Sequence, residues 1–306
     1  EHPDTALSLN NLGSLLQDQG DLAGARPYYE RALAIRERVL GPNHPDTAQS
    51  LNNLGALLQD QGDLAGARAY YERALAIRER ILGPQHPQTA TAVSNLGALL
   101  YAQGDLAGAR AYLERALAIS ERILGPEHPQ TATSLSNLGD LLQAQGDLAG
   151  ARAYLERALA IRERVLGPEH TDTAQSFNNL GSLLQAQGDL AGARPYVERA
   201  LAIVEKLLGP EHPNVATLNN NLGGLLEAQG DLAGARPYYE RALAIRERVL
   251  GPEHPQTAAA VNNLGSLLRA QGDLAGARSY FERALAILER VLGPEHPDTA
   301  QSLNNL

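Results

Sequence analysis

The chain has 306 residues, no Cys or Met, and 26 basic against 35 acidic residues, which gives a net charge of -9 at pH 7. This balance argues against nucleic acid or an anionic membrane as the main partner, and the absence of Cys excludes disulfides and thiolate-held zinc and favours a reducing, cytoplasmic compartment. No apolar run approaches the roughly 18 residues of a membrane span. Because the chain begins Glu1-His2-Pro3 without Met, we expect it to be a piece of a longer protein.

A histidine-centred motif recurs with a constant period of 42 residues. Its histidines are His2, His44, His86, His128, His170, His212, His254 and His296. Constant spacing in this range indicates a stacked repeat architecture. We therefore expect a single repeat array over residues 1-306, composed of units 1-42, 43-84, 85-126, 127-168, 169-210, 211-252 and 253-294 and a partial eighth unit, 295-306.

Each unit is predicted to form two helices. In the first unit, apolar residues recur at spacings of three and four over about residues 4–19, where Gly20 ends the helix and Asp21 caps the next one. From Leu22 the apolar residues cover more than half of a helix circumference before Gly41 and Pro42 end the segment. The second helix is therefore expected to be buried on two sides, and each unit to be a helical hairpin.

Metal, cofactor and catalytic sites are not indicated. The eight histidines recur only once per hairpin, and stacked hairpins lie about 8 to 10 Å apart, whereas zinc requires nitrogen ligands at about 2.0 to 2.1 Å. We interpret each histidine as a loop residue that ends one hairpin and begins the next. No glycine-rich loop is followed by Lys-Ser or Lys-Thr, so a phosphate-binding loop of that type is also absent from the sequence.

The pattern of small and large residues resembles the tetratricopeptide repeat. The matching positions of the first unit are Asn11, Leu12, Gly13, Leu16, Gly20, Ala25, Tyr29 and Ala32. Leu9 replaces the usual tryptophan, and Glu37 replaces the proline that normally ends the second helix, which therefore runs on and lengthens the repeat to 42 residues. The 42-residue repeats resemble those of kinesin light chain and nephrocystin-like proteins. The resemblance implies an all-α, right-handed superhelical solenoid of antiparallel helix hairpins.

The first helix of each unit carries a polar stripe, which in tetratricopeptide proteins lines the concave groove. The position of Asn11 is asparagine in all seven units: Asn11, Asn53, Asn95, Asn137, Asn179, Asn221 and Asn263. By resemblance, this amide holds the backbone of an extended peptide, since an amide both donates and accepts hydrogen bonds. The alternative is that these asparagines form hydrogen bonds within or between hairpins.

Other positions on the stripe differ between units and are candidates for specificity. They include Tyr101, Asp140, Glu227 and Arg269. Arg269 is the only basic residue on the stripe, whereas related proteins that bind acidic cargo use several. We therefore expect a peptide-binding module for an extended, neutral or mildly basic segment of a protein partner, without cofactor, metal or catalytic residues.

Four further expectations concern the function, the charged run, the sixth unit and the two ends of the array. The alternative function is a sensing or autoinhibitory repeat arm of a larger bacterial signalling ATPase or protease-like protein. The charged run that includes Arg26, Glu30 and Arg36 is either a solvated face or an ionic partner surface. The sixth unit departs most from the others, at Val215 and Asn219, and the two uncovered ends of the array are expected to associate end to end.

Overall fold

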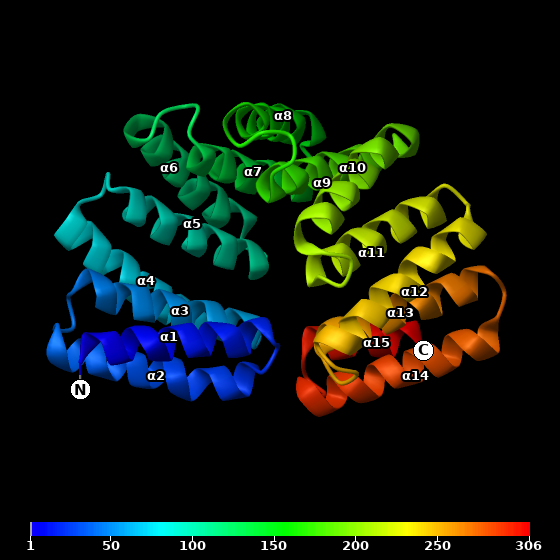
Figure 1. Ribbon diagram of the computed structural model, residues 1–306, viewed down its shortest axis with the longest axis horizontal. Coiled ribbons are helices and arrows are strands. Elements are labelled where there is room, and N and C mark those ends of the chain that lie inside the picture. The colour runs from blue at the N-terminus through cyan, green and yellow to red at the C-terminus, as the bar shows by residue number, and fades with distance from the viewer. Residues whose placement is uncertain (1) are drawn as a thin grey trace. The chain divides into compact units, whose positions relative to one another are not determined.

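The computed structural model describes residues 2–306, which contain 15 α-helices and no strand (Figure 1). The first helices of successive hairpins are α1 (Pro3–Asp18), α3 (Pro45–Asp60), α5 (Pro87–Ala102), α7 (Pro129–Ala144), α9 (Thr171–Ala186), α11 (Pro213–Ala228) and α13 (Pro255–Ala270). The second helices are α2 (Leu22–Val39), α4 (Leu64–Leu82), α6 (Leu106–Ile123), α8 (Leu148–Val165), α10 (Leu190–Leu208), α12 (Leu232–Val249) and α14 (Leu274–Val291). A shorter helix, α15 (Pro297–Asn305), follows. The predicted all-α hairpins are confirmed.

The histidine motif begins each first helix. His44 is the N-cap of α3, and its Nδ1 accepts a hydrogen bond from the backbone N–H of Asp46 at 3.2 Å. Pro45 occupies the first helical turn, where a missing N–H leaves no hydrogen bond unmade. The same His cap begins α1, α5, α7, α9, α11, α13 and α15. The predicted structural role of the histidines is therefore confirmed.

The turn inside each hairpin is defined by a glycine and an aspartate. Gly20 has a φ of 79°, a left-handed conformation that favours glycine and ends α1. Asp21 then caps α2 by accepting from the N–H of Gly24 at 2.8 Å. A Cβ at Gly24 would lie 2.1 Å from the Asp21 carboxylate, so this second glycine is required by the cap.

The two helices of a hairpin pack through a glycine on one helix and a large side chain on the other. A Cβ at Gly55 of α3 would lie 2.7 Å from the ring of Tyr71 on α4, and one at Gly97 of α5 would lie 2.7 Å from Leu113 on α6. The large residues are buried, at 4% and 3% exposure. Because a second helix also packs against the next first helix, neighbouring hairpins share one apolar core.

The contacts group the chain into two compact units, the first ending at Ile161 and the second comprising Arg162–Leu306. Within each unit, consecutive hairpins are joined by the same polar contact at the loop. The hydroxyl of Thr47 donates to the carbonyl of Gly41 at 2.8 Å. Thr89, Thr131, Thr173, Thr257 and Thr299 make the equivalent bond. The sixth hairpin has Val215 at this position, which has no hydroxyl to donate.

Most of the charged run on the second helices is paired within the array. Arg26 binds Glu30 one turn away at 2.8 Å, and this pair recurs in the other six hairpins. Arg73 of α4 binds Glu37 of α2 at 2.6 Å, which links two hairpins. Arg36, however, is only 7% exposed, so its assignment to this surface run was wrong. Its position faces the next hairpin, as described below.

Candidate functional site

The candidate site is the polar stripe on the first helices, at the positions of residues 7, 10, 11, 14, 17 and 18 and their equivalents in later units; we call it the first-helix polar face. Asn11 is exposed and the six equivalent asparagines are half-buried. Tyr101, Asp140 and Arg269 are exposed, whereas Glu227 is half-buried. Regular helical spacing places these residues on one side of their helices, as predicted from the sequence.

The asparagines form hydrogen bonds between neighbouring first helices. The side-chain amide of Asn95 on α5 donates to the Asn52 oxygen on α3 at 2.6 Å, and Asn137 on α7 donates to Ser94 on α5 at 3.0 Å. Asn53, Asn221 and Asn263 make the equivalent bond with Asn10, Asn178 and Asn220. Each amide has a second N–H in addition to the bond described, and each oxygen can accept two hydrogen bonds, one of which Gln49 supplies to Asn53 at 2.9 Å. These asparagines therefore join hairpins and retain hydrogen-bonding capacity.

The variable residues differ in how they are held. The Glu227 carboxylate accepts a hydrogen bond from the Tyr239 hydroxyl at 2.8 Å, and burial together with this contact raises the pKa of Tyr239. The Arg269 guanidinium lies 5.5 Å from the ring centre of Phe281, within the range of a cation–π contact. The Tyr101 side chain is 42% exposed. The polar face therefore presents an aromatic side chain on α5 and charged groups of opposite sign on α11 and α13.

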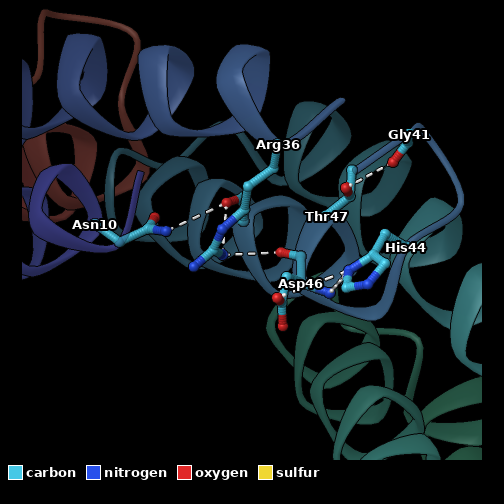
Figure 2. Close-up of polar contacts among 7 residues, drawn as sticks. Asn10, Arg36, Gly41, His44, Asp46 and Thr47 are labelled. Carbon is cyan, nitrogen blue, oxygen red and sulfur yellow. Dashed lines mark hydrogen bonds and ion pairs between the residues drawn. The ribbon is translucent and has the colours of Figure 1, made fainter. Parts of the chain in front are cut away.

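A buried arginine, which the sequence did not predict, lies beneath this face. Arg36 extends from α2 to α3, where its Nη1 donates to the Asp46 carbonyl at 2.8 Å and to the Ser50 hydroxyl at 2.9 Å (Figure 2). Asn10 of α1 donates to the same hydroxyl at 3.3 Å. Desolvation by burial lowers the pKa of Arg36, partly offset by the Asp46 charge. This arginine thus joins the polar face to the junction between hairpins.

Arg78, Arg162 and Arg246 are buried at the same repeat position. The sequence contained a signal for this burial, because Arg36 follows Ala32 and Leu33 by four and three residues on the apolar side of α2. A further signal is that Val204 and Leu288 occupy the same position in later units.

Neither a metal cluster nor a membrane span is formed by residues 2–306. No group of three or more His, Asp or Glu side chains in this range is arranged to hold a metal ion. No helix in the same range combines the length and apolar character needed to cross a bilayer.

The family model for the tetratricopeptide repeat matches residues 4–80, 50–118, 88–164, 134–206, 172–233, 214–289 and 257–306. These overlapping matches extend over nearly the whole chain, which therefore belongs to the tetratricopeptide repeat family. Repeats of this family generally serve as protein–protein interaction modules, on a scaffold that is typically non-enzymatic. No curated protein sequence matches the chain.

Solved structures with similar folds include kinesin light chain-like proteins. BtubC (BKLC) from P. vanneervenii is 28% identical with a TM-score of 0.57, over 75% of this chain and 91% of that chain. A putative kinesin light chain repeat protein from Podosopora anserina is 29% identical with a TM-score of 0.53, over 67% and 97% of the two chains. RapI, at 17% identity and a TM-score of 0.65, covers 94% of this chain and 98% of its own, and shows likeness of fold alone. The resemblance to kinesin light chain-like repeats is confirmed.

Proposed function

We propose that the chain is a cytoplasmic interaction module that binds an extended, neutral or mildly basic protein segment along the first-helix polar face, which corresponds to the concave groove of the family. The observation that carries this proposal is the column of asparagines whose amides retain donors and acceptors beside the bonds that join the hairpins. The bound segment would use those groups through its backbone. Side-chain preference would come from Tyr101, Asp140, Glu227 and Arg269.

Charge supports a neutral or basic ligand. The chain carries a net charge of -9. On the polar face, the acidic side chains of Asp140 and Glu227 stand against one basic side chain, that of Arg269. An acidic segment would meet like charge along most of its length. We expect a dissociation constant of about 1 µM, because single net hydrogen bonds contribute only about 0.5 to 1.5 kcal/mol and association costs about 4 to 15 kcal/mol.

The test combines Asn137→Ala with Asn179→Ala. A 12-residue peptide is first selected against the chain from a random displayed library, and its binding to the wild-type and variant chains is measured by calorimetric titration. We expect binding to weaken by about tenfold, which corresponds to the loss of about 1.4 kcal/mol.

The control is Ser94→Ala, which removes the oxygen that Asn137 binds at 3.0 Å but leaves the Asn137 amide in place. Peptide affinity should stay close to wild type in this variant if the amide acts on the ligand. If both variants lower peptide affinity equally, or if the double variant stays folded and binds as well as wild type, the asparagines only join the hairpins.

A further inference from the structure

A cavity of about 100 Å³ lies at the junction of α9, α10 and α11, wholly within the second compact unit. Its lining includes Gln175, Asn178, Val204, Asn214, Thr217 and Leu218. Gln175, Asn178 and Thr217 belong to the first-helix polar face, so the cavity borders the proposed peptide site. Val204 and Leu218 are buried and form its apolar wall.

The equivalent space at the junction of α4 and α5 is occupied by an arginine. Arg78 stands at the repeat position of Val204, three units earlier in the chain. Its Nη2 donates to the Gln49 side-chain oxygen at 2.9 Å, and its Nη1 donates to the Gln88 carbonyl at 3.1 Å. Gln49 and Gln88 correspond to Gln175 and Asn214. Replacement of the arginine by Val204 thus removes a guanidinium from between two oxygen acceptors.

The acceptor in α9 keeps the arrangement that it has beside the arginine. The Gln49 amide donates to Asn53 at 2.9 Å, which directs its oxygen to Arg78. The Gln175 amide likewise donates to the Asn179 oxygen, at 2.6 Å. With its nitrogen engaged in the same way, Gln175 presents its oxygen as the acceptor for a new donor.

A second cavity repeats this relation. Leu288 occupies the arginine position of the seventh hairpin, and a cavity of about 280 Å³ is lined by Leu288, Asn262, Asp298 and Gln301. These four residues correspond to Val204, Asn178, Asn214 and Thr217, all of which line the first cavity. The Asn262 oxygen is buried and has no hydrogen-bond partner within the described chain. Both cavities therefore accompany an aliphatic residue at the position of the buried arginine.

We propose that the cavity beside Val204 receives an arginine side chain of the bound segment. Its guanidinium would donate to the Gln175 oxygen and the Asn214 carbonyl, as Arg78 does at the earlier junction, and its aliphatic part would pack on Val204 and Leu218. Arginine fits better than lysine because its planar fork addresses two separate acceptors at once. This inference rests on the proposed function and assigns a basic residue of the segment to one place on the polar face.

The probes for the test are three capped peptides, acetyl-Gly-Gly-Xaa-Gly-Gly-amide with Xaa as arginine, lysine or glutamine, titrated by NMR. We expect the arginine peptide to shift the signals of Gln175, Asn178 and Thr217, and to bind about tenfold more tightly than the glutamine peptide, since hydrogen bonds from a charged donor are stronger than neutral ones. Equal binding of the arginine and glutamine peptides would overturn the proposal.

Val204→Arg should fill the cavity with the protein's own guanidinium and abolish these shifts. If Leu218 obstructs the new side chain, Val204→Arg combined with Leu218→Ala reproduces the natural pairing of Arg246 with Ala260. Thermal melting verifies that the variants are folded. Undiminished binding of the arginine peptide to a folded filled variant contradicts the assignment.

Arg78→Val is the reciprocal variant. It opens the equivalent space in the first compact unit and should create a second site, reported by new shifts at Gln49 and Gln88 on addition of the arginine peptide. The two proposals can fail separately. If the library-selected peptide still binds the Val204→Arg variant at full strength, the cavity proposal fails while binding along the polar face stands. If no extended peptide binds but the short arginine probe does, binding along the polar face fails while the arginine site in the cavity stands.

Discussion

At the scale of single residues, the sixth hairpin carries a local conflict. Asn219 is 0% exposed at a position that is leucine, valine or phenylalanine in the other units. Its amide donates to the Val215 carbonyl at 2.8 Å, but its oxygen has no partner in the described chain. A buried polar atom without a partner costs about 1 to 3 kcal/mol. The α11–α12 hairpin is therefore expected to be the least stable hairpin of the second compact unit.

We predict that Asn219→Leu raises the free energy of unfolding by about 1 to 3 kcal/mol, because it removes this unsatisfied oxygen and supplies the side chain of sibling repeats. Denaturant titration measures the change. In the wild-type chain, amide exchange in α11 should be faster than in α9, and Asn219→Leu should slow the exchange in α11. Leu135→Asn, at the same position in α7, is the control and should destabilise. An unchanged or lower unfolding midpoint for Asn219→Leu would refute this explanation.

A second substitution addresses the adjacent defect. Val215→Thr should restore the hydroxyl that donates to the loop carbonyl in the other junctions, here that of Gly209, and add about 0.5 to 1.5 kcal/mol of stability. Thermal melting of Val215→Thr against Val215→Ala separates the hydrogen bond from a change in side-chain size. No gain from threonine over alanine would mean that the loop of this hairpin has a different geometry.

At the scale of elements, the histidine cap of α13 makes the start of that helix sensitive to acid. The Nδ1 atom must be unprotonated to accept the helix N–H, as it does for His254 at 3.1 Å from the Gln256 nitrogen. Burial, with a smaller effect of the Arg246 charge, lowers the pKa of His254 below 6.5. The folded chain therefore binds this proton less readily than the unfolded chain. Stability from this group is complete above about pH 6.5 and falls as the pH decreases toward the folded-state pKa.

We predict that His254→Asp reduces the loss of stability between pH 7.5 and pH 5.5 by up to about 1 kcal/mol. Aspartate retains an acceptor at the N-cap and does not titrate as imidazole in this range. Unfolding free energies at the two pH values supply the measurement, with His254→Ala as the variant that lacks the cap at both. Identical pH dependence of wild type and His254→Asp would show that this cap does not contribute to acid sensitivity.

The elements themselves were predictable from the sequence, whereas several polar contacts were not. Periodicity and the Gly20 and Asp21 signals located α1 and α2 to within one residue of their observed ends. The burial of Arg36 was missed because flanking Glu37 and Arg38 give the appearance of a solvated run. The sequence could not show whether the repeated asparagines bond to the preceding first helix or bind a peptide, because an amide is equally suited to both. The cavity beside Val204 could not be predicted, because it is recognised only from the place that the Arg78 side chain occupies at the equivalent junction.

At the scale of the whole molecule, the two ends of this chain expose residues that internal repeats bury. Leu12 and Leu15 are 39% and 52% exposed, whereas the equivalent Leu54 and Leu57 are 1% and 0% exposed. At the other end, Leu303 is 49% exposed, whereas the equivalent Leu51 and Leu135 are both 0% exposed. Stacked repeats gain stability from covering such faces.

We predict that the 306-residue chain associates end to end at high concentration, and that Leu12→Gln with Leu15→Gln weakens this association by about tenfold or more, because burying a leucine is worth about 1.5 to 3 kcal/mol. Sedimentation velocity over a concentration series is the measurement. Ile81→Gln with Ile123→Gln, which alters exposed aliphatic residues of internal hairpins, should leave association unchanged. A wild-type chain that stays monomeric at millimolar concentration would contradict the prediction.

The constant spacing of the contacts between hairpins has a genetic consequence. Asn95 and Asn52, like Asn263 and Asn220, are separated by 43 residues, so duplication or loss of a 42-codon block leaves each such contact with an equivalent partner. The pairing of Val204 with Leu218 extends across the boundary between two units. Recombination between these two residues would pair Val204 with the serine or alanine that other repeats have at the position of Leu218. It would also pair Leu218 with a buried arginine of another repeat. At this junction, the segment that must be inherited intact is therefore α10 together with α11.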